Sequence, residues 1–222
     1  MAYLPNLIFF ILLVCSLGLF VRNLKRIKRN IFLGRNIDRS DSPSLRLQNM
    51  IRVAFGQSKM VSRPLAGILH LIVYIGFVLI NIELIEIIID GLIGKHRFFA
   101  AYLGFFYNIL IFSFEVLALL VLITVLLFWT RRNVIKIKRF WNSDIKGWPK
   151  QDADNILYFE IVLMLLFLSM NATDSLLQDY GAINYIKAGS FPVSKFLTPL
   201  FQGFQIETLI ILERSFWWFH II

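Results

Sequence analysis

One histidine in an apolar stretch is the residue of this chain whose chemistry most clearly requires a partner. His70 is the only histidine between Arg63 and Glu83, and it lies in an apolar run that begins after Pro64. An imidazole in hydrocarbon must find a partner, because an unsatisfied polar group there is expensive. The residues leave two alternatives open, which are a hydrogen bond to a neighbouring helix and axial ligation of a haem iron.

Four carboxylates in apolar surroundings could exchange protons. Glu83, Glu86 and Asp90 lie toward the far end of the His70 run, and Glu115 lies near the middle of the next apolar run. Ionisable residues inside a membrane segment are functional candidates by default. The alternatives are a polar helix end that faces water for Glu86 and Asp90, and a hydrogen-bonded structural role for Glu115.

Composition places these residues in an integral membrane protein. The chain has 222 residues, of which 58% are hydrophobic, more than a soluble domain of this size needs. Runs long enough to cross a hydrocarbon core of about 30 Å predict an all-α bundle of five transmembrane helices. The predicted spans are residues 3–21, 65–89, 102–129, 156–171 and 206–222.

The charges predict the orientation of the bundle. Eleven of the 23 Lys and Arg residues fall in Arg22–Arg63 and seven in Arg131–Asn155, so these two segments are predicted to be cytoplasmic. The N-terminus, residues 94–97 and residues 172–205 are predicted to lie outside. The formal net charge of +9 therefore reports topology, and nucleic acid is excluded as the partner.

The single cysteine, a proline and the basic segment after the first span give three further predictions. Cys15 is the single cysteine, which excludes an internal disulfide and a cysteine-ligated iron–sulfur cluster within these residues. Trp148-Pro149 predicts a turn before a helix that is capped by Asp152–Asn155. Within Arg22–Arg63, a basic stretch with interleaved apolar residues and a weakly amphipathic stretch predict a pair of interfacial helices. The alternative is a docking surface for a cytoplasmic partner.

The last span allows two entry points. It enters the membrane at Ile206, which buries Glu213 and Arg214, or it enters near Trp217 and is very short. No basic segment follows it. We therefore expect the chain to be a fragment that stops inside a span.

Several segments together resemble a known family. They are RPLAGILHLIVYIGF, GKHRFF, RRNVIKIKRFW, KGWPKQDADNILYFEIVLM and ERSFWWFHII. They resemble the membrane domain of bacterial iron–sulfur-binding oxidoreductases, which is related to the respiratory nitrate reductase gamma subunit and to the cytochrome b subunit of membrane heterodisulfide reductase. The resemblance covers essentially the whole chain. It implies a multi-pass protein of the bacterial plasma (inner) membrane, with five helices, an outer N-terminus and b-type haem.

The resemblance also implies site residues. In the family pattern, His70 and His220 match two of four haem-ligating histidines. The position of a further ligand is occupied by Ile80, and the fourth lies beyond Ile222. His96, in the predicted outer turn, is expected to be a surface or loop-capping residue rather than a substitute ligand.

Two hypotheses for function follow. In the first, the chain is a membrane electron-transfer domain that passes electrons between quinone and a cytoplasmic iron–sulfur module through haem b. The 4Fe–4S clusters would lie in a C-terminal part that is absent here. Glu83, Glu86, Asp90 and Glu115 would exchange quinol protons, and the chain would be part of an oxidoreductase without being catalytic alone. In the second, the chain is a haem-free membrane anchor. Transport is disfavoured, because the chain has no duplicated half.

Overall fold

The structure is a computed structural model that describes residues 3–35, 37–38, 40–60, 63–141 and 147–221. These residues form helices and turns, and none of them forms a β-strand, so the predicted all-α class is confirmed for this part of the chain. Residues 142–146 of the predicted second cytoplasmic segment and Ile222 of the predicted last span lie outside the described residues.

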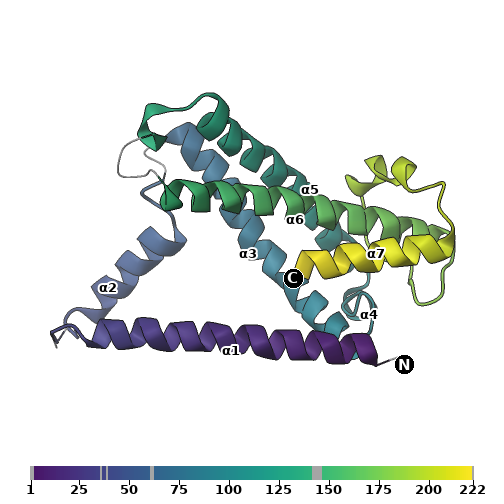
Figure 1. The fold of residues 1–222 in the computed structure, drawn as a ribbon, viewed down its shortest axis with the longest axis horizontal. Coiled ribbons are helices and arrows are strands. Elements are labelled where there is room, and N and C mark those ends of the chain that lie inside the picture. The colour runs from purple at the N-terminus through teal and green to yellow at the C-terminus, as the bar shows by residue number, and fades with distance from the viewer. Residues whose placement is uncertain (1–2, 36, 39, 61–62, 142–146, 222) are drawn as a thin grey trace. The chain divides into compact units, whose positions relative to one another are not determined.

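Four helices are long and apolar enough to cross a membrane (Figure 1). They are α1 (Leu4–Phe32), α3 (Pro64–Ile93), α5 (Phe105–Trp129, continued by a π-helical turn over Thr130–Val134) and α6 (Trp148–Asp179). They contain between 25 and 32 residues before the π-helical turn is added, and each therefore exceeds about 30 Å at 1.5 Å per residue. Four of the five predicted spans thus correspond to helices of spanning length, which indicates a membrane protein.

The fifth predicted span is shorter. Helix α7 (Ile206–Ile221) has 16 residues, or about 24 Å. It begins at Ile206, which is the first of the two predicted entry points.

The remaining helices are short. Helix α2 (Pro43–Met50) is followed by a π-helical turn over Ile51–Phe55, so the second of the two stretches predicted to be interfacial helices is helical, and its interfacial position stays a prediction. The first is instead the continuation of α1, which runs through its basic residues to Phe32. Helix α4 (Ala100–Leu103) precedes α5.

The first compact unit comprises residues 1–67 and 84–95. Here α1 crosses the end of α3: Asn6 Nδ2 donates to the carbonyl of Gly91 at 2.9 Å, and Phe9 is buried. A Cβ atom at Gly91 would come within 2.5 Å of the Phe9 ring, so the crossing requires glycine. Helix α3 then ends at Gly94 in the left-handed conformation, the usual helix terminator.

The second compact unit comprises residues 68–83 and 96–222. Helix α6 packs against both α5 and α7 (Figure 1), and the core between them is aromatic and aliphatic. Its fully buried side chains include Tyr107, Ile111 and Phe114 of α5, Phe167 and Leu177 of α6, and Leu209 of α7. Helix α3 approaches α5 at Gly76, where a Cβ atom would meet Val121 at 2.7 Å.

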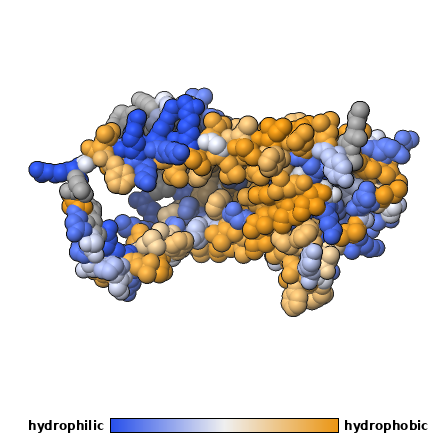
Figure 2. Space-filling view, turned by 90° about the horizontal axis from the view of Figure 1, so that it is seen from below, coloured by the Kyte–Doolittle hydropathy of each residue, from blue (hydrophilic) through white to orange (hydrophobic). Residues whose placement is uncertain are grey.

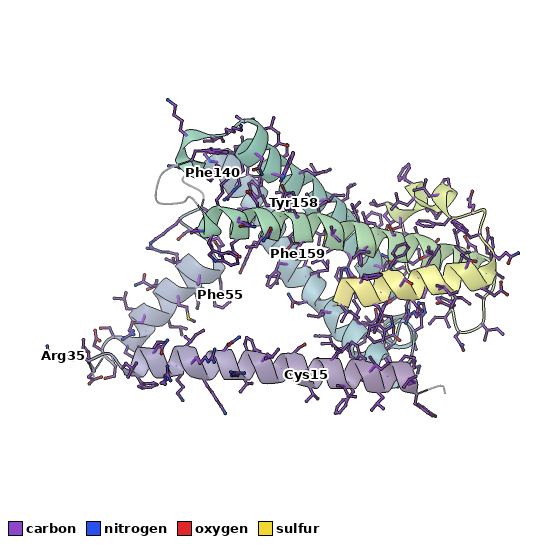
Figure 3. The ribbon with its side chains drawn as sticks, in the orientation of Figure 1. Cys15, Arg35, Phe55, Phe140, Tyr158 and Phe159 are labelled. Carbon is purple, nitrogen blue, oxygen red and sulfur yellow. The ribbon has the colours of Figure 1, made fainter. Side chains whose placement is uncertain are left out.

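The outward faces of the helices are apolar. Large hydrophobic side chains are exposed along α1, α3 and α5, and Figure 2 shows broad hydrophobic areas on the visible face. Cys15 on α1 and Tyr158 and Phe159 on α6 (Figure 3) are also exposed. A soluble monomer rarely exposes so much apolar surface, whereas lipid would cover it.

Helix α6 is longer at both ends than residues 156–171. Pro149 lies in its first turn rather than in a preceding turn, and Gly147 with φ of 77° precedes the helix. Proline suits this position, because the first helical N–H groups have no partner within the helix. At the other end, the helix continues to Asp179, so residues 172–179, predicted to be outer loop, are helical.

Candidate functional site

A buried arginine–aspartate pair lies where the α3–α4 turn meets α6. Arg97 has a left-handed backbone with φ of 49°, which is uncommon for a residue other than glycine. Its Nε donates to Asp174 Oδ2 at 2.7 Å, and Nη2 lies 2.5 Å from the same oxygen. Arg97 is 8% exposed and Asp174 is 1% exposed. A pair so completely removed from water needs further hydrogen bonds to offset desolvation.

Neighbouring side chains supply those hydrogen bonds. Arg97 Nη1 donates to the hydroxyl of Tyr107 at 3.1 Å, and Nη2 donates to Asn171 Oδ1 at 3.0 Å. The guanidinium also lies 5.0 Å from the ring centroid of Phe191, within the range of a cation–π contact. Burial alone would lower the pKa of Arg97, but Asp174 and Tyr107 help to raise it well above its ordinary value. Arg97 is therefore permanently charged.

The imidazole of His96 lies on the other side of Asp174. Its Nε2 is 3.2 Å from Asp174 Oδ1, and its ring centroid is 4.8 Å from that of Tyr185. The side chain is 14% exposed. Its Nδ1 atom is buried and has no hydrogen-bond partner among the described residues. The prediction of a surface or loop-capping residue is wrong, because α6 supplies an acidic partner for His96.

Glu115 of α5 is held by four donors. Asn171 Nδ2 at 3.1 Å and the hydroxyl of Ser194 donate to Oε1. The backbone N–H groups of Val193 and Ser194 donate to Oε2 at 2.9 and 3.0 Å. These bonds use the accepting capacity of a carboxylate. Asn171 thus links Glu115 to Arg97, since its oxygen accepts from Arg97 while its nitrogen donates to Glu115.

We call this set the Arg97 cluster. Its members are connected through hydrogen bonds or ion pairs, and all except the partly buried His96 are buried: His96, Arg97, Tyr107, Glu115, Asn171, Asp174 and Ser194.

The segment between α6 and α7 is fixed onto the same helices. Gln178 of α6 makes a reciprocal pair of hydrogen bonds with the backbone of Ala188, both at 3.1 Å. Asn108 of α5 accepts from the N–H of Gly189 at 2.8 Å. The loop therefore covers the Arg97 cluster in a defined position.

A buried charge on α7 is connected to the neighbourhood of the cluster. The hydroxyl of Tyr185 donates to Glu213 Oε2 at 2.9 Å, and Arg214 binds both carboxylate oxygens of Glu213 at 2.6 Å. Burial raises the pKa of Tyr185, and Glu213 raises it further. The charged pair that an entry at Ile206 would bury is thus present and hydrogen-bonded.

A second ionic cluster lies at the opposite end of α5 and α6. Arg132 Nε is 2.7 Å from Asp154 Oδ1, and its side chain donates to the carbonyl of Lys150 at 2.9 Å. Asn133 Nδ2 also donates to Asp154 at 3.2 Å, and Trp141 Nε1 donates to the carbonyl of Arg132 at 3.2 Å. We call these five residues the Arg132 cluster.

The structure separates the four predicted carboxylates. Glu115 belongs to the Arg97 cluster. Glu83 is buried on α3, and its charge contributes to the raised pKa of Arg97. Glu86 and Asp90 belong to the first compact unit and are buried, so a water-facing helix end is wrong for both.

The two predicted haem ligands lie on different helices. His70 is half-buried in the second turn of α3. His220 lies in the last turn of α7, with its ring centroid 6.1 Å from that of Phe167. No group of three or more His, Cys, Asp and Glu residues among the described residues could hold a metal ion. Ligation of haem by His70 and His220 stays a prediction.

Sequence reasoning missed the residues that anchor the cluster. Arg97, Asn171 and Asp174 were available as signals, because Asn171 and Asp174 stand one turn apart just after the apolar run of α6. Polar residues in such a position usually face the interior of a bundle. Because the predicted span ended at Asn171, Asp174 was assigned to the outer loop and its place in the bundle was missed.

Comparison with known proteins gives two distant relatives. The chain is 26% identical over 216 residues to the probable iron–sulfur-binding oxidoreductase FadF of Bacillus subtilis, covering 97% of this chain and 28% of that protein. It is 26% identical over 192 residues to the EtfAB:quinone oxidoreductase of Syntrophomonas wolfei, covering 83% of this chain and 25% of that protein.

Both relatives are much longer than this chain. It spans about a quarter of the length of the curated relatives it matches. No protein-family model matches the chain, and no solved structure matches it significantly. The two similarities support a distant relationship to iron–sulfur oxidoreductases.

Proposed function

We propose that the chain is a membrane electron-transfer domain that exchanges electrons between the quinone pool and an iron–sulfur module on the cytoplasmic side. The single observation that carries the proposal is the similarity of 97% of the chain to a protein named as an iron–sulfur-binding oxidoreductase. The name of the second relative supplies quinone as the other partner. Four helices of spanning length support a place in the lipid bilayer, which we propose to be a bacterial plasma membrane.

The proposed orientation puts the two ionic clusters on opposite sides of the membrane. The basic segments that flank α1, α3, α5 and α6 face the cytoplasm, and the Arg97 cluster faces outward. Alkaline phosphatase fused after Arg97 is then expected to be active, and after Lys138 inactive. The reverse pattern would refute the orientation.

Quinone would bind at the outward end. Among the predicted carboxylates, Glu83, Glu86 and Asp90 remain candidates for proton exchange. Glu115 is better explained as a structural acceptor, because four donors already occupy its oxygens.

Haem b is proposed as the electron carrier, with His70 and His220 as its axial ligands. One observation fits this role: His220 Nδ1 is buried and has no hydrogen-bond partner among the described residues. A bound haem would supply one-electron transfer. The chain's contribution would be to present the imidazoles and exclude water around them.

Absorbance and electron-transfer measurements on membranes that contain the protein expressed from its own gene test the proposal. We expect menadiol to reduce the iron–sulfur clusters, measured by electron paramagnetic resonance, and a haem absorbance that His70→Ala changes and His96→Ala does not. Absence of any menadiol-dependent reduction would refute the electron-transfer function. An unchanged haem spectrum in His70→Ala would refute the ligand assignment alone.

The alternative is a haem-free membrane anchor for the iron–sulfur module. Ile80 favours it, because an aliphatic side chain that cannot bind iron occupies the position of a further ligand. Cluster reduction by menadiol without any haem absorbance would remove haem from the proposal, and the loss of both would favour the anchor.

A further inference from the structure

His96 combines a fixed ring with a vacant nitrogen. Its Nε2 faces Asp174 Oδ1 at 3.2 Å, and the Tyr185 ring packs against it at 4.8 Å with an interplanar angle of 55°. These contacts define the orientation of the imidazole. The opposite nitrogen, Nδ1, is buried and has no hydrogen-bond partner among the described residues.

The carboxylate beside the imidazole already has a cationic partner. Asp174 is already paired with Arg97 through Oδ2, so it does not require a second cation. Nε2 lies 3.2 Å from Oδ1, and the tautomer with its proton on Nε2 keeps a lone pair at Nδ1 that can accept a proton. The titratable groups in contact with His96 are Asp174 of α6 and Tyr185. Asp174 pairs with Arg97, which is also influenced by Glu83 of α3, and Tyr185 donates to Glu213 of α7.

The other acidic groups of the cluster are poorly suited to this task. Both oxygens of Glu115 accept from two donors each. Protonation of Asp174 would leave the buried Arg97 without its counter-ion, which is strongly unfavourable. His96 instead offers a ring nitrogen, Nδ1, that has no hydrogen-bond partner among the described residues.

We infer that His96 Nδ1 accepts a hydroxyl proton from quinol, and that Asp174 is the positioning residue for this base. The inference rests on the proposed function, which supplies the quinol and the electron acceptor. Oxidation of a quinol releases two electrons and two protons. The electrons pass to the one-electron carriers of the oxidoreductase. One quinol O–H bond breaks as an N–H bond forms at Nδ1, and the proton of the second O–H bond is released to water at the outward end.

Asp174 then stabilises the imidazolium, and the proton leaves toward the side on which His96 retains its small exposure. Quinone reduction would run through the same steps in reverse. A base held in this way contributes roughly 10²–10⁴-fold to a proton-transfer step.

The test compares His96→Gln with the wild type in the full-length protein in membranes. Glutamine retains a hydrogen-bonding side chain but cannot take up a proton. We expect kcat for menadiol oxidation to fall roughly 100-fold or more, the acid limb of the kcat/KM profile to disappear, and the haem spectrum and dithionite-reducible clusters to remain. Lys187→Ala, on an 85% exposed side chain, is the matched surface control and is expected to be unchanged.

A second variant protects the test against misfolding. If His96→Gln does not accumulate, His96→Asn takes its place. The kcat/KM profile of the wild type is then expected to show an acid limb that the profile of His96→Asn lacks. Normal menadiol kinetics in either variant would overturn the role of His96 and leave the proposed function standing. No menadiol-dependent cluster reduction in the wild type would overturn the proposed function itself.

Discussion

The two ends of α5 and α6 each hold an arginine that pairs with an aspartate of α6, in different surroundings. The side chains of Arg97 and Asp174 are 7% and 1% exposed, whereas those of Arg132 and Asp154 are 12% and 14% exposed. Arg97 has side-chain partners on several sides, whereas Arg132 pairs with Asp154, donates to the carbonyl of Lys150 and lies 5.9 Å from the ring centroid of Phe140.

The difference shows how burial determines what an ion pair does. A partly hydrated pair loses little when one partner is removed, because water replaces it. A buried pair contributes little net stability as a whole, but removing one member leaves an uncompensated charge. The Arg97–Asp174 pair therefore adds little to the free energy of unfolding, but it requires α4, α5, α6 and the covering loop to keep this arrangement.

The largest expected loss of stability comes from replacing Asp174 by asparagine, and the same replacement of Asp154 is the matched control. Asp174→Asn leaves the Arg97 charge without its counter-ion and is expected to lower the free energy of unfolding by about 3–5 kcal/mol. Asp154→Asn is expected to cost no more than about 1 kcal/mol. Denaturation with sodium dodecyl sulfate in mixed micelles measures both, and equal losses would show that burial does not distinguish the pairs.

Glu115→Gln tests whether a carboxylate is required inside the buried cluster. Glutamine places an NH₂ group where two donors now point, so it loses about 2–3 kcal/mol through unsatisfied buried groups. Glu160→Gln on α6 removes a half-buried carboxylate and serves as the control, with a smaller expected loss. The same denaturation assay applies, and a neutral Glu115→Gln would mean that Glu115 is protonated in the folded protein.

Tyr185→Phe tests the hydrogen bond that joins Tyr185, beside the Arg97 cluster, to Glu213 of α7. Loss of the hydrogen bond to Glu213 is expected to cost about 1 kcal/mol near neutral pH. Because the pKa of Tyr185 is raised by burial and Glu213, the contribution of its neutral form is complete below about pH 10 and is lost as the pH rises further. Stability measured across this range should therefore fall less in Tyr185→Phe than in the wild type. A steeper alkaline loss in the variant would contradict the assignment.

Arg132→Ala should show the smallest effect and the clearest salt dependence. We expect a loss of about 0.5–1 kcal/mol at low ionic strength that shrinks as salt is added, because a partly exposed pair is screened. Arg97→Ala should cost more and change little with salt. A salt-independent loss in Arg132→Ala would show that packing against Phe140, rather than charge, is what the side chain contributes.

The helices were predictable from sequence, because a long apolar run is a local signal. The apolar runs around His70 and Glu115 predicted α3 and α5, and the Ile206 start of α7 was one of two predicted entries. Pro149 was misread, since proline is compatible both with a turn and with the first turn of a helix. The continuation of α6 past Asn171 was missed because its polar residues resemble a loop when their partners are unknown.

The candidate site depended on contacts between distant parts of the chain. His96 looked exposed from its neighbours Lys95 and Arg97, and only the return of α6 places Asp174 beside it. Glu115 was recognised as unusual, but the loop donors at Val193 and Ser194 that explain it lie far along the chain. Such pairings leave little local trace in a single sequence.

The spacing of the two aspartates along α6 has a consequence for how the protein sits in a bilayer. The helical rise from Asp154 to Asp174 is about 30 Å, the thickness of a typical hydrocarbon core. One ionic cluster lies at each end of α6, so the length of helix between the clusters sets the distance between the two membrane faces. Adding a single residue between them would rotate one end by about 100° relative to the other, so that both aspartates could no longer face their arginines. The depth of α6 in the bilayer and its rotation about its own axis are therefore fixed together. The loop between α6 and α7 then keeps a constant distance from the membrane face at the other end of α6.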